Sequence, residues 1–111
     1  MASKGSRGIV ASSGNVFADL GVRGAEDKHA KVQLAVAING LLRQRALSQT
    51  AAARVLGIPQ PKISALANYR VRGFSVERLI GLLTRLDRDI EIVIRPKPRS
   101  RKNGRIQVTA A

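Results

Sequence analysis

Apolar residues recur at helical spacing along four stretches of this chain, at residues 26–45, 49–56, 61–69 and 76–87. In the first stretch the repeating apolar positions are Ala30, Leu34, Ala37, Ile38, Leu41 and Leu42. Because apolar residues spaced three and four apart form one face of an α-helix, the pattern predicts four amphipathic helices.

Residues that favour helix ends mark the boundaries of these stretches. Ser48 and Ser75 precede the second and fourth helices as expected N-caps, and Gly57 can end the second helix in the left-handed conformation. The residue before a proline avoids the α region, whereas proline is favoured at the first helical position. We therefore expect Gln60 to be the N-cap of the third helix and Pro61 its first residue.

After the fourth helix the pattern changes to a period of two. In residues 89–95, Ile90, Ile92 and Ile94 alternate with other residues, which predicts a β-strand. A weaker strand is expected at residues 105–109. A lone strand cannot satisfy its own hydrogen bonds, so residues 89–95 must pair either with residues 105–109 in a hairpin or with a second subunit. We expect a homodimer with these three isoleucines at its interface.

The chain is strongly basic, because its 111 residues include 20 Lys and Arg against 7 Asp and Glu, a formal net charge of +13. Residues 48–74 and 95–111 contain no acidic residue. Such a distribution requires an anionic partner and favours nucleic acid.

The composition also excludes several classes of protein. The chain has no Cys, and its three aromatic residues are too few for surfaces that stack single-stranded bases. His29 has no partner at catalytic or metal-ligand spacing, so we expect neither an enzyme nor a metal or cofactor site. The longest apolar run, residues 34–38, is far too short for a membrane helix. We expect a cytoplasmic protein that does not bind membranes.

Residues 49–66 have the features of a helix-turn-helix. Small, glycine and branched apolar residues occur where two short helices must pack closely, namely at Ala53, Leu56, Gly57, Ile58, Ile63 and Leu66. Together these positions are far more specific than any one of them alone.

The stretch SQTAAARVLGIPQPKISAL resembles the XRE-type (phage-repressor-like) DNA-binding fold. More narrowly, NVFADLG, QPKISAL and DIEIVIRP resemble HigA-like antitoxins, and the resemblance covers residues 15–96. It implies a mainly α protein, with a four- to five-helix repressor-like domain at 16–88 and a short C-terminal β-strand at 89–96 for dimerisation. A flexible leader at 1–15 and a basic tail at 97–111 would flank it.

The resemblance also implies roles for individual residues. The helix beginning at Gln60 would be the recognition helix in the major groove, with base-reading candidates Gln60, Lys62 and Ser64. Phosphate contacts would come from Gln49, Arg70 and Arg72. Two simpler interpretations stay open: Gln60 can act only as a helix cap, and the two arginines can belong to a solvated loop.

These inferences predict a sequence-specific repressor that binds double-stranded DNA at its own operon, on the nucleoid in the cytoplasm. By resemblance to HigA-like antitoxins, it would also bind a RelE-like toxin. The alternative is a sequence-tolerant, basic nucleic-acid-binding protein of architectural function, in which the net charge supplies the affinity.

Overall fold

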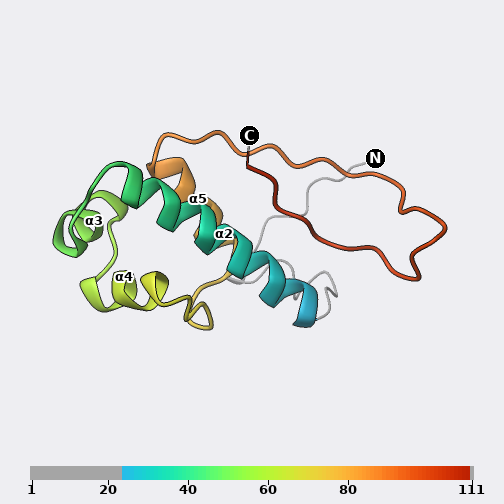
Figure 1. Ribbon diagram of the computed structural model, residues 1–111, viewed down its shortest axis with the longest axis horizontal. Helices are drawn as coiled ribbons and strands as arrows, with labels where there is room; N and C mark the ends of the chain where they lie inside the picture. The colour runs from blue at the N-terminus through green and yellow to red at the C-terminus, as the bar shows by residue number, and fades with distance from the viewer. Residues whose placement is uncertain (1–23, 111) are drawn as a thin grey trace.

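A computed structural model describes residues 24–110 of the chain, so the expected leader at 1–15 lies outside the described residues. The described part contains four helices: α2 (Gly24–Gln44), α3 (Gln49–Leu56), α4 (Gln60–Ala67) and α5 (Val76–Arg85). The long α2 packs against α4 and α5, and α3 packs against both α4 and α5 (Figure 1). The mainly α architecture expected from the sequence is therefore confirmed for these residues.

A single apolar core lies between the four helices. Its largest fully buried side chains are Ile38, Leu56, Leu66, Val76, Leu79, Leu82 and Leu86. Burying each large aliphatic side chain stabilises the fold by about 1.5–3 kcal/mol. On α2 the buried face is turned slightly from the expected one, because Ala35 and Asn39 are buried while Ala37 and Leu41 are only half-buried.

Three of the predicted helix caps are confirmed. Ser48 Oγ accepts a hydrogen bond from the Ala51 N–H at 3.1 Å, and Ser75 Oγ accepts one from the Arg78 N–H at 3.0 Å. Gly57 has a φ of +68° and follows α3 in the left-handed conformation. These local signals fix where α3 and α5 begin and where the turn after α3 is made.

The start of α4 differs by one residue from the prediction. Pro59 is the N-cap, with φ −63° and ψ 150°, so Gln60 is the first helical residue rather than the cap. The Pro59 carbonyl accepts the Lys62 N–H at 2.9 Å. Pro61 fits one position further along, because the first N–H groups of a helix need no intrahelical acceptor.

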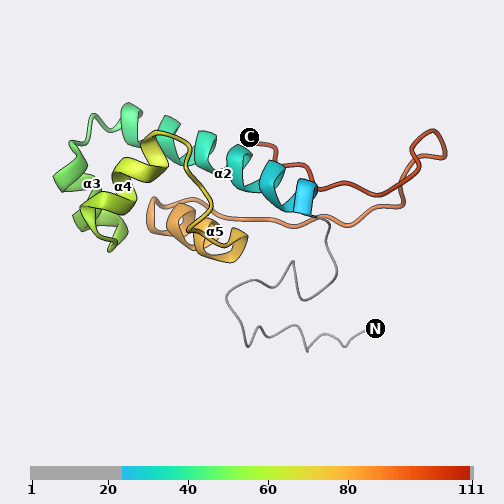
Figure 2. The same ribbon diagram turned by 90° about the horizontal axis from the view of Figure 1, so that it is seen from below.

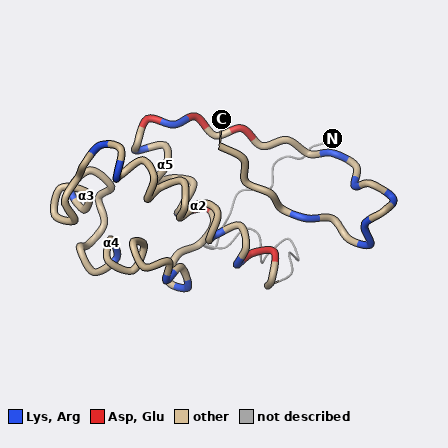
Figure 3. Tube along the Cα trace, in the orientation of Figure 1, with Lys and Arg blue, Asp and Glu red and all other residues tan. Residues whose placement is uncertain are grey.

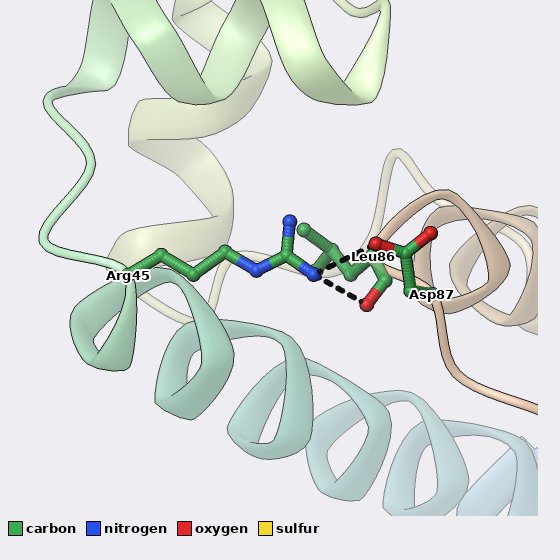
Figure 4. A network of polar contacts seen from close by, with 3 residues as sticks. All are labelled: Arg45, Leu86 and Asp87. Atoms are coloured by element: carbon green, nitrogen blue, oxygen red, sulfur yellow. Dashed lines mark hydrogen bonds and ion pairs between the residues drawn. The ribbon is translucent and has the colours of Figure 1, made fainter.

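Arg45 joins the end of α2 to the end of α5 (Figure 4). Its Nη2 donates to the Leu86 carbonyl at 2.7 Å and to Asp87 Oδ2 at 3.3 Å. A cation at the C-terminal end of a helix satisfies carbonyls without intrahelical partners and is favoured by the helix dipole. This contact sets the direction in which the chain leaves α5.

The predicted C-terminal strand does not form among residues 24–110, where no β-strand is present. Residues 89–95 run out from α5 as extended chain, with Ile92 72% and Ile94 92% exposed. Figure 1 shows this arm and the returning arm at residues 105–109 running apart, as the two sides of an open loop. A strand requires a partner for its ladder, and the described residues of one copy supply none to residues 89–95.

The returning arm contacts α2 instead of forming the hairpin. The Ile106 N–H donates to Glu26 Oε1 and the Val108 N–H donates to Gln33 Oε1, each at 3.0 Å. The two aliphatic side chains of the arm, Ile106 and Val108, are partly buried and pack against the core. Figure 2 shows this arm meeting the first half of α2. The backbone N–H groups of Ile106 and Val108 are therefore not available for a hairpin with residues 89–95.

Replacing Gly57 with alanine is expected to lower the free energy of unfolding by about 1–2 kcal/mol. A side chain is strained at a φ of +68°, and an added Cβ would lie 3.1 Å from Arg85 Nη2. Gly81, within α5, is the control because open space surrounds it. Gly81→Ala should raise the free energy of unfolding by about 0.5–1 kcal/mol. Urea unfolding measures the free energy of unfolding of both variants. The same change in both would contradict a special role of the left-handed conformation at Gly57.

Candidate nucleic-acid interface

Helices α3 and α4 form one rigid unit, joined by the tight turn at Gly57. Leu56, Ile58, Ile63 and Leu66 are each at most 5% exposed, and they connect the two helices through the core. This is the helix-turn-helix predicted from the spacing of these residues. It leaves the beginning of α4 on the molecular surface.

Asn39, on α2, holds the C-terminal end of α4 in place. It lies in the middle of α2, is only 6% exposed, and donates from Nδ2 to the Leu66 carbonyl at 2.9 Å. That carbonyl belongs to the last turn of α4 and also accepts the Tyr69 N–H at 3.0 Å. We did not single out Asn39 from the sequence. The available signal was a polar residue beside the apolar positions of α2.

Gln60 is exposed and is the first residue of α4. The N-cap of α4 is Pro59, so the Gln60 side chain is not in the capping position. The amide is therefore available to bond the edge of a base, and the interpretation of Gln60 as a cap alone does not apply. Ser64 lies one turn further along the same edge of α4 and is half-buried. Its carbonyl accepts the Asn68 Nδ2 at 2.9 Å.

Lys62 is directed away from Gln60 and Ser64, toward the loop before α5. Its Nζ donates to the Gly73 carbonyl at 3.0 Å and lies 4.9 Å from the centre of the Phe74 ring. A base contact through this ammonium would require both interactions to be given up. In this arrangement Lys62 holds the loop at 70–73 against α4.

The loop after α4 presents two arginines on either side of a buried residue. Val71 is 5% exposed and anchors the loop in the core, whereas Arg70 and Arg72 are exposed. The Arg70 N–H donates to the Ala65 carbonyl at 2.8 Å, which fixes the start of the loop. Gln49, at the beginning of α3, is also exposed. All three expected phosphate-contacting residues thus lie on the surface of the helix-turn-helix or of the loop that follows it.

The helix-turn-helix segment differs in charge from the start of the chain that follows α5. The segment 48–74, which comprises α3, α4 and the following loop, carries four basic residues and no acidic one. The acidic residues Asp87, Asp89 and Glu91 lie on the extended chain after α5, on the side away from α4 (Figure 3). A surface of one sign attracts polyanions to the exposed start of α4.

Other kinds of site are poorly represented in residues 24–110. No group of three or more His, Cys, Asp or Glu side chains in this range is placed to hold a metal ion. None of the described helices is long and apolar enough to cross a membrane. His29 is exposed at the rim of an open pocket of about 410 Å³ between α2 and the returning arm.

The sequence matches the family described as helix-turn-helix domain over residues 16–95. The chain belongs to this family. A solved structure described as an XRE family transcriptional regulator is 57% identical, with a TM-score of 0.75. The match covers 80% of this chain and 100% of that one. No curated protein matches the sequence. At this identity and coverage, the helix-turn-helix domain is of XRE type.

In this helix-turn-helix protein, Lys62→Met is expected to lower the free energy of unfolding by about 1 kcal/mol, since it removes one hydrogen bond and one cation–π contact. The methionine retains most of the aliphatic packing. Lys28→Met, on the exposed first turns of α2, removes the same charge and should change stability by less than about 0.5 kcal/mol. Thermal unfolding compares the two. Equal stabilities would show that Lys62 does not hold the loop.

Proposed function

We propose that this protein is a sequence-specific repressor of transcription, which places α4 in the major groove of DNA. Membership of the helix-turn-helix family and likeness to an XRE-type regulator support the general activity, DNA-binding transcriptional regulation. The observation that carries the finer proposal is the exposed Gln60 amide at the start of α4. It stands on a helix that Asn39 holds at its far end and that is followed by a loop with the exposed Arg70 and Arg72.

In this proposal the bases are read mainly by Gln60, whose amide can bond adenine through two hydrogen bonds. Ser64, one turn along α4, contacts a base or a phosphate. Lys62, considered above as a third base-reading candidate, supports the loop instead, in keeping with its bond to Gly73. With so few side chains at the bases, DNA shape contributes the remaining specificity.

Affinity is supplied mainly by contacts to the phosphates. We assign Gln49 at the start of α3 and Arg70 and Arg72 in the loop after α4, all three exposed, to the DNA backbone. The basic tail at 97–111 adds attraction that does not depend on sequence. Binding should therefore weaken steeply as salt is raised.

A single recognition helix reads few base pairs, and we propose that two copies bind a two-fold symmetric site. The exposed Ile90, Ile92 and Ile94 are the residues assigned to the dimer interface. The footprint should then consist of two half-sites about one helical turn apart.

We further propose that the protein is an antitoxin that represses its own operon on the cytoplasmic nucleoid, with a RelE-like toxin as its partner. The similarity of NVFADLG, QPKISAL and DIEIVIRP to HigA-like antitoxins supports this role. If a neighbouring gene encodes a small RelE-like protein, the two products should co-purify after co-expression. A regulator without such a neighbour would be a stand-alone repressor.

Footprinting on the DNA upstream of the protein's own gene, repeated over a range of salt concentrations, tests the proposed function. The proposal predicts two protected half-sites that persist after protection elsewhere is lost at higher salt. Even protection of the whole fragment, lost everywhere at the same salt concentration, would instead support the sequence-tolerant architectural protein.

A further inference from the structure

The chain after α5 exposes an unusual run of apolar residues. Ile90 is 37% exposed, Ile92 72%, Val93 56% and Ile94 92%, so both faces of this extended segment lie largely in water. An extended segment with exposed aliphatic side chains and unpaired backbone groups is a template for strand pairing. It requires a partner that supplies both a backbone ladder and apolar contacts.

The rest of the same chain does not supply that partner among the described residues. Among residues 24–110, the returning arm at 105–109 is the nearby extended segment, and its Ile106 and Val108 N–H groups are bonded to Glu26 and Gln33 of α2. We therefore consider a second molecule as the partner.

Charge along the segment indicates which molecule fits. Acidic residues stand at its beginning, Asp89 and Glu91, and basic residues at its end, Arg95 and Lys97. Parallel pairing of two copies in register would bring like charges together, which is unfavourable. Antiparallel pairing brings the acidic half of one copy beside the basic half of the other, so the segment is complementary to itself.

The position of the charges also selects a register. With Val93 opposite its own copy, Glu91 faces Arg95 of the second copy, Asp89 faces its Lys97, and Ile92 faces its Ile94. Centring the pair on Ile92 would match Asp89 with Arg95 but leave Glu91 opposite Val93. The first register places both acidic residues opposite basic residues. Pro96, which lacks an N–H, lies near each end of the pair.

We propose that residues 89–97 are the surface by which two copies of this protein join, as an antiparallel pair of strands centred on Val93. The proposal rests on the two-fold repressor proposed above and deepens it by naming the dimer contact and its register. The dimer axis then passes beside Val93, in the chain after α5, which Figure 3 shows on the side of the molecule away from α4. This leaves both recognition helices free for DNA.

Disulfide trapping in the full chain tests the register, since the protein has no cysteine of its own. Residues directly opposite in an antiparallel pair have Cα atoms about 4.5–5.5 Å apart, within the range of a disulfide. Val93→Cys should therefore give a covalent dimer after mild oxidation without DNA. Ile92→Cys is the matched control, because two copies of residue 92 would lie diagonally, about 7–8 Å apart. A mixture of the Ile92→Cys and Ile94→Cys proteins should crosslink.

Three results would overturn the proposal. Crosslinking by Ile92→Cys alone would place the centre at Ile92. Trapping by none of these variants in a dimeric wild type would place the interface elsewhere. A monomeric wild type at tens of micromolar would assign the segment to a different protein. Specific footprints from the same preparation would still support the repressor, so the two proposals fail separately.

A charge exchange tests the same register without cysteine. Glu91→Lys places like charges opposite each other at two symmetric positions and should raise the dimer dissociation constant on the order of tenfold. Adding Arg95→Glu should restore it to near the wild-type value. Glu77→Lys, an exposed change of equal charge on α5, should leave it unaltered. Sedimentation measures all three, and no rescue in the double variant would refute the pairing.

Discussion

Asn39→Ala is expected to lower the free energy of unfolding by about 1.5–3 kcal/mol, the largest effect of any single polar substitution that we predict. The change removes the side-chain donor to the Leu66 carbonyl, which then keeps only its bond from the Tyr69 N–H at 3.0 Å. It also leaves unfilled space beside Ile38 and Leu66, which are fully buried. Urea unfolding followed by circular dichroism measures this loss.

Asn68→Ala is the matched control for this prediction. Asn68 also donates from Nδ2 to a carbonyl of α4, that of Ser64, at the same distance of 2.9 Å, but it does so at the surface. Water replaces the lost donor there, so the expected cost is below about 1 kcal/mol. Equal losses for the two variants would show that Asn39 does not act as a buried anchor of α4.

Replacing Arg70 and Arg72 together by alanine is expected to weaken operator binding by about one to two orders of magnitude at 0.1 M salt. Each phosphate contact contributes about 0.9 to the slope of log K against log salt, so the slope should fall by about two. The loss should be similar for every DNA sequence, because phosphate contacts position the protein without reading bases. Fluorescence anisotropy at several salt concentrations measures both quantities.

The control for this pair removes two charges from elsewhere on the surface. Lys28 lies near the start of α2 and Arg88 follows α5, and both are exposed. The Lys28→Ala and Arg88→Ala double variant should change the salt slope by less than about one. If both double variants lower the slope equally, then net charge rather than the loop after α4 determines the affinity.

The helix ends were predictable because their signals are local. Ser48, Gly57 and Ser75 act through hydrogen bonds and backbone angles within a few residues, and the sequence places them within one residue of the structure. The start of α4 was displaced by one residue because Gln60 is helical although a proline follows it, and Pro59, with a ψ of 150°, is the N-cap instead. Family resemblance added which of these helices would enter the groove.

The contacts between distant residues were not predictable from periodicity. The apolar positions of α2 span a broad face, and only the packing of α4 and α5 decides that Asn39 is buried rather than Leu41. Lys62 bonds to Gly73, eleven residues away, although its sequence context fitted a base contact equally well. The arm at 105–109 has strand-like alternation, yet acceptors on α2 take the N–H groups that a hairpin would use.

The most direct test of the account is the binding of wild-type protein and Gln60→Ala to a set of operators that each carry one changed base pair. We predict that the variant loses about 1–3 kcal/mol of discrimination at one base pair in each half-site, with the salt slope unchanged. Discrimination retained at every position by Gln60→Ala would contradict base reading by the start of α4.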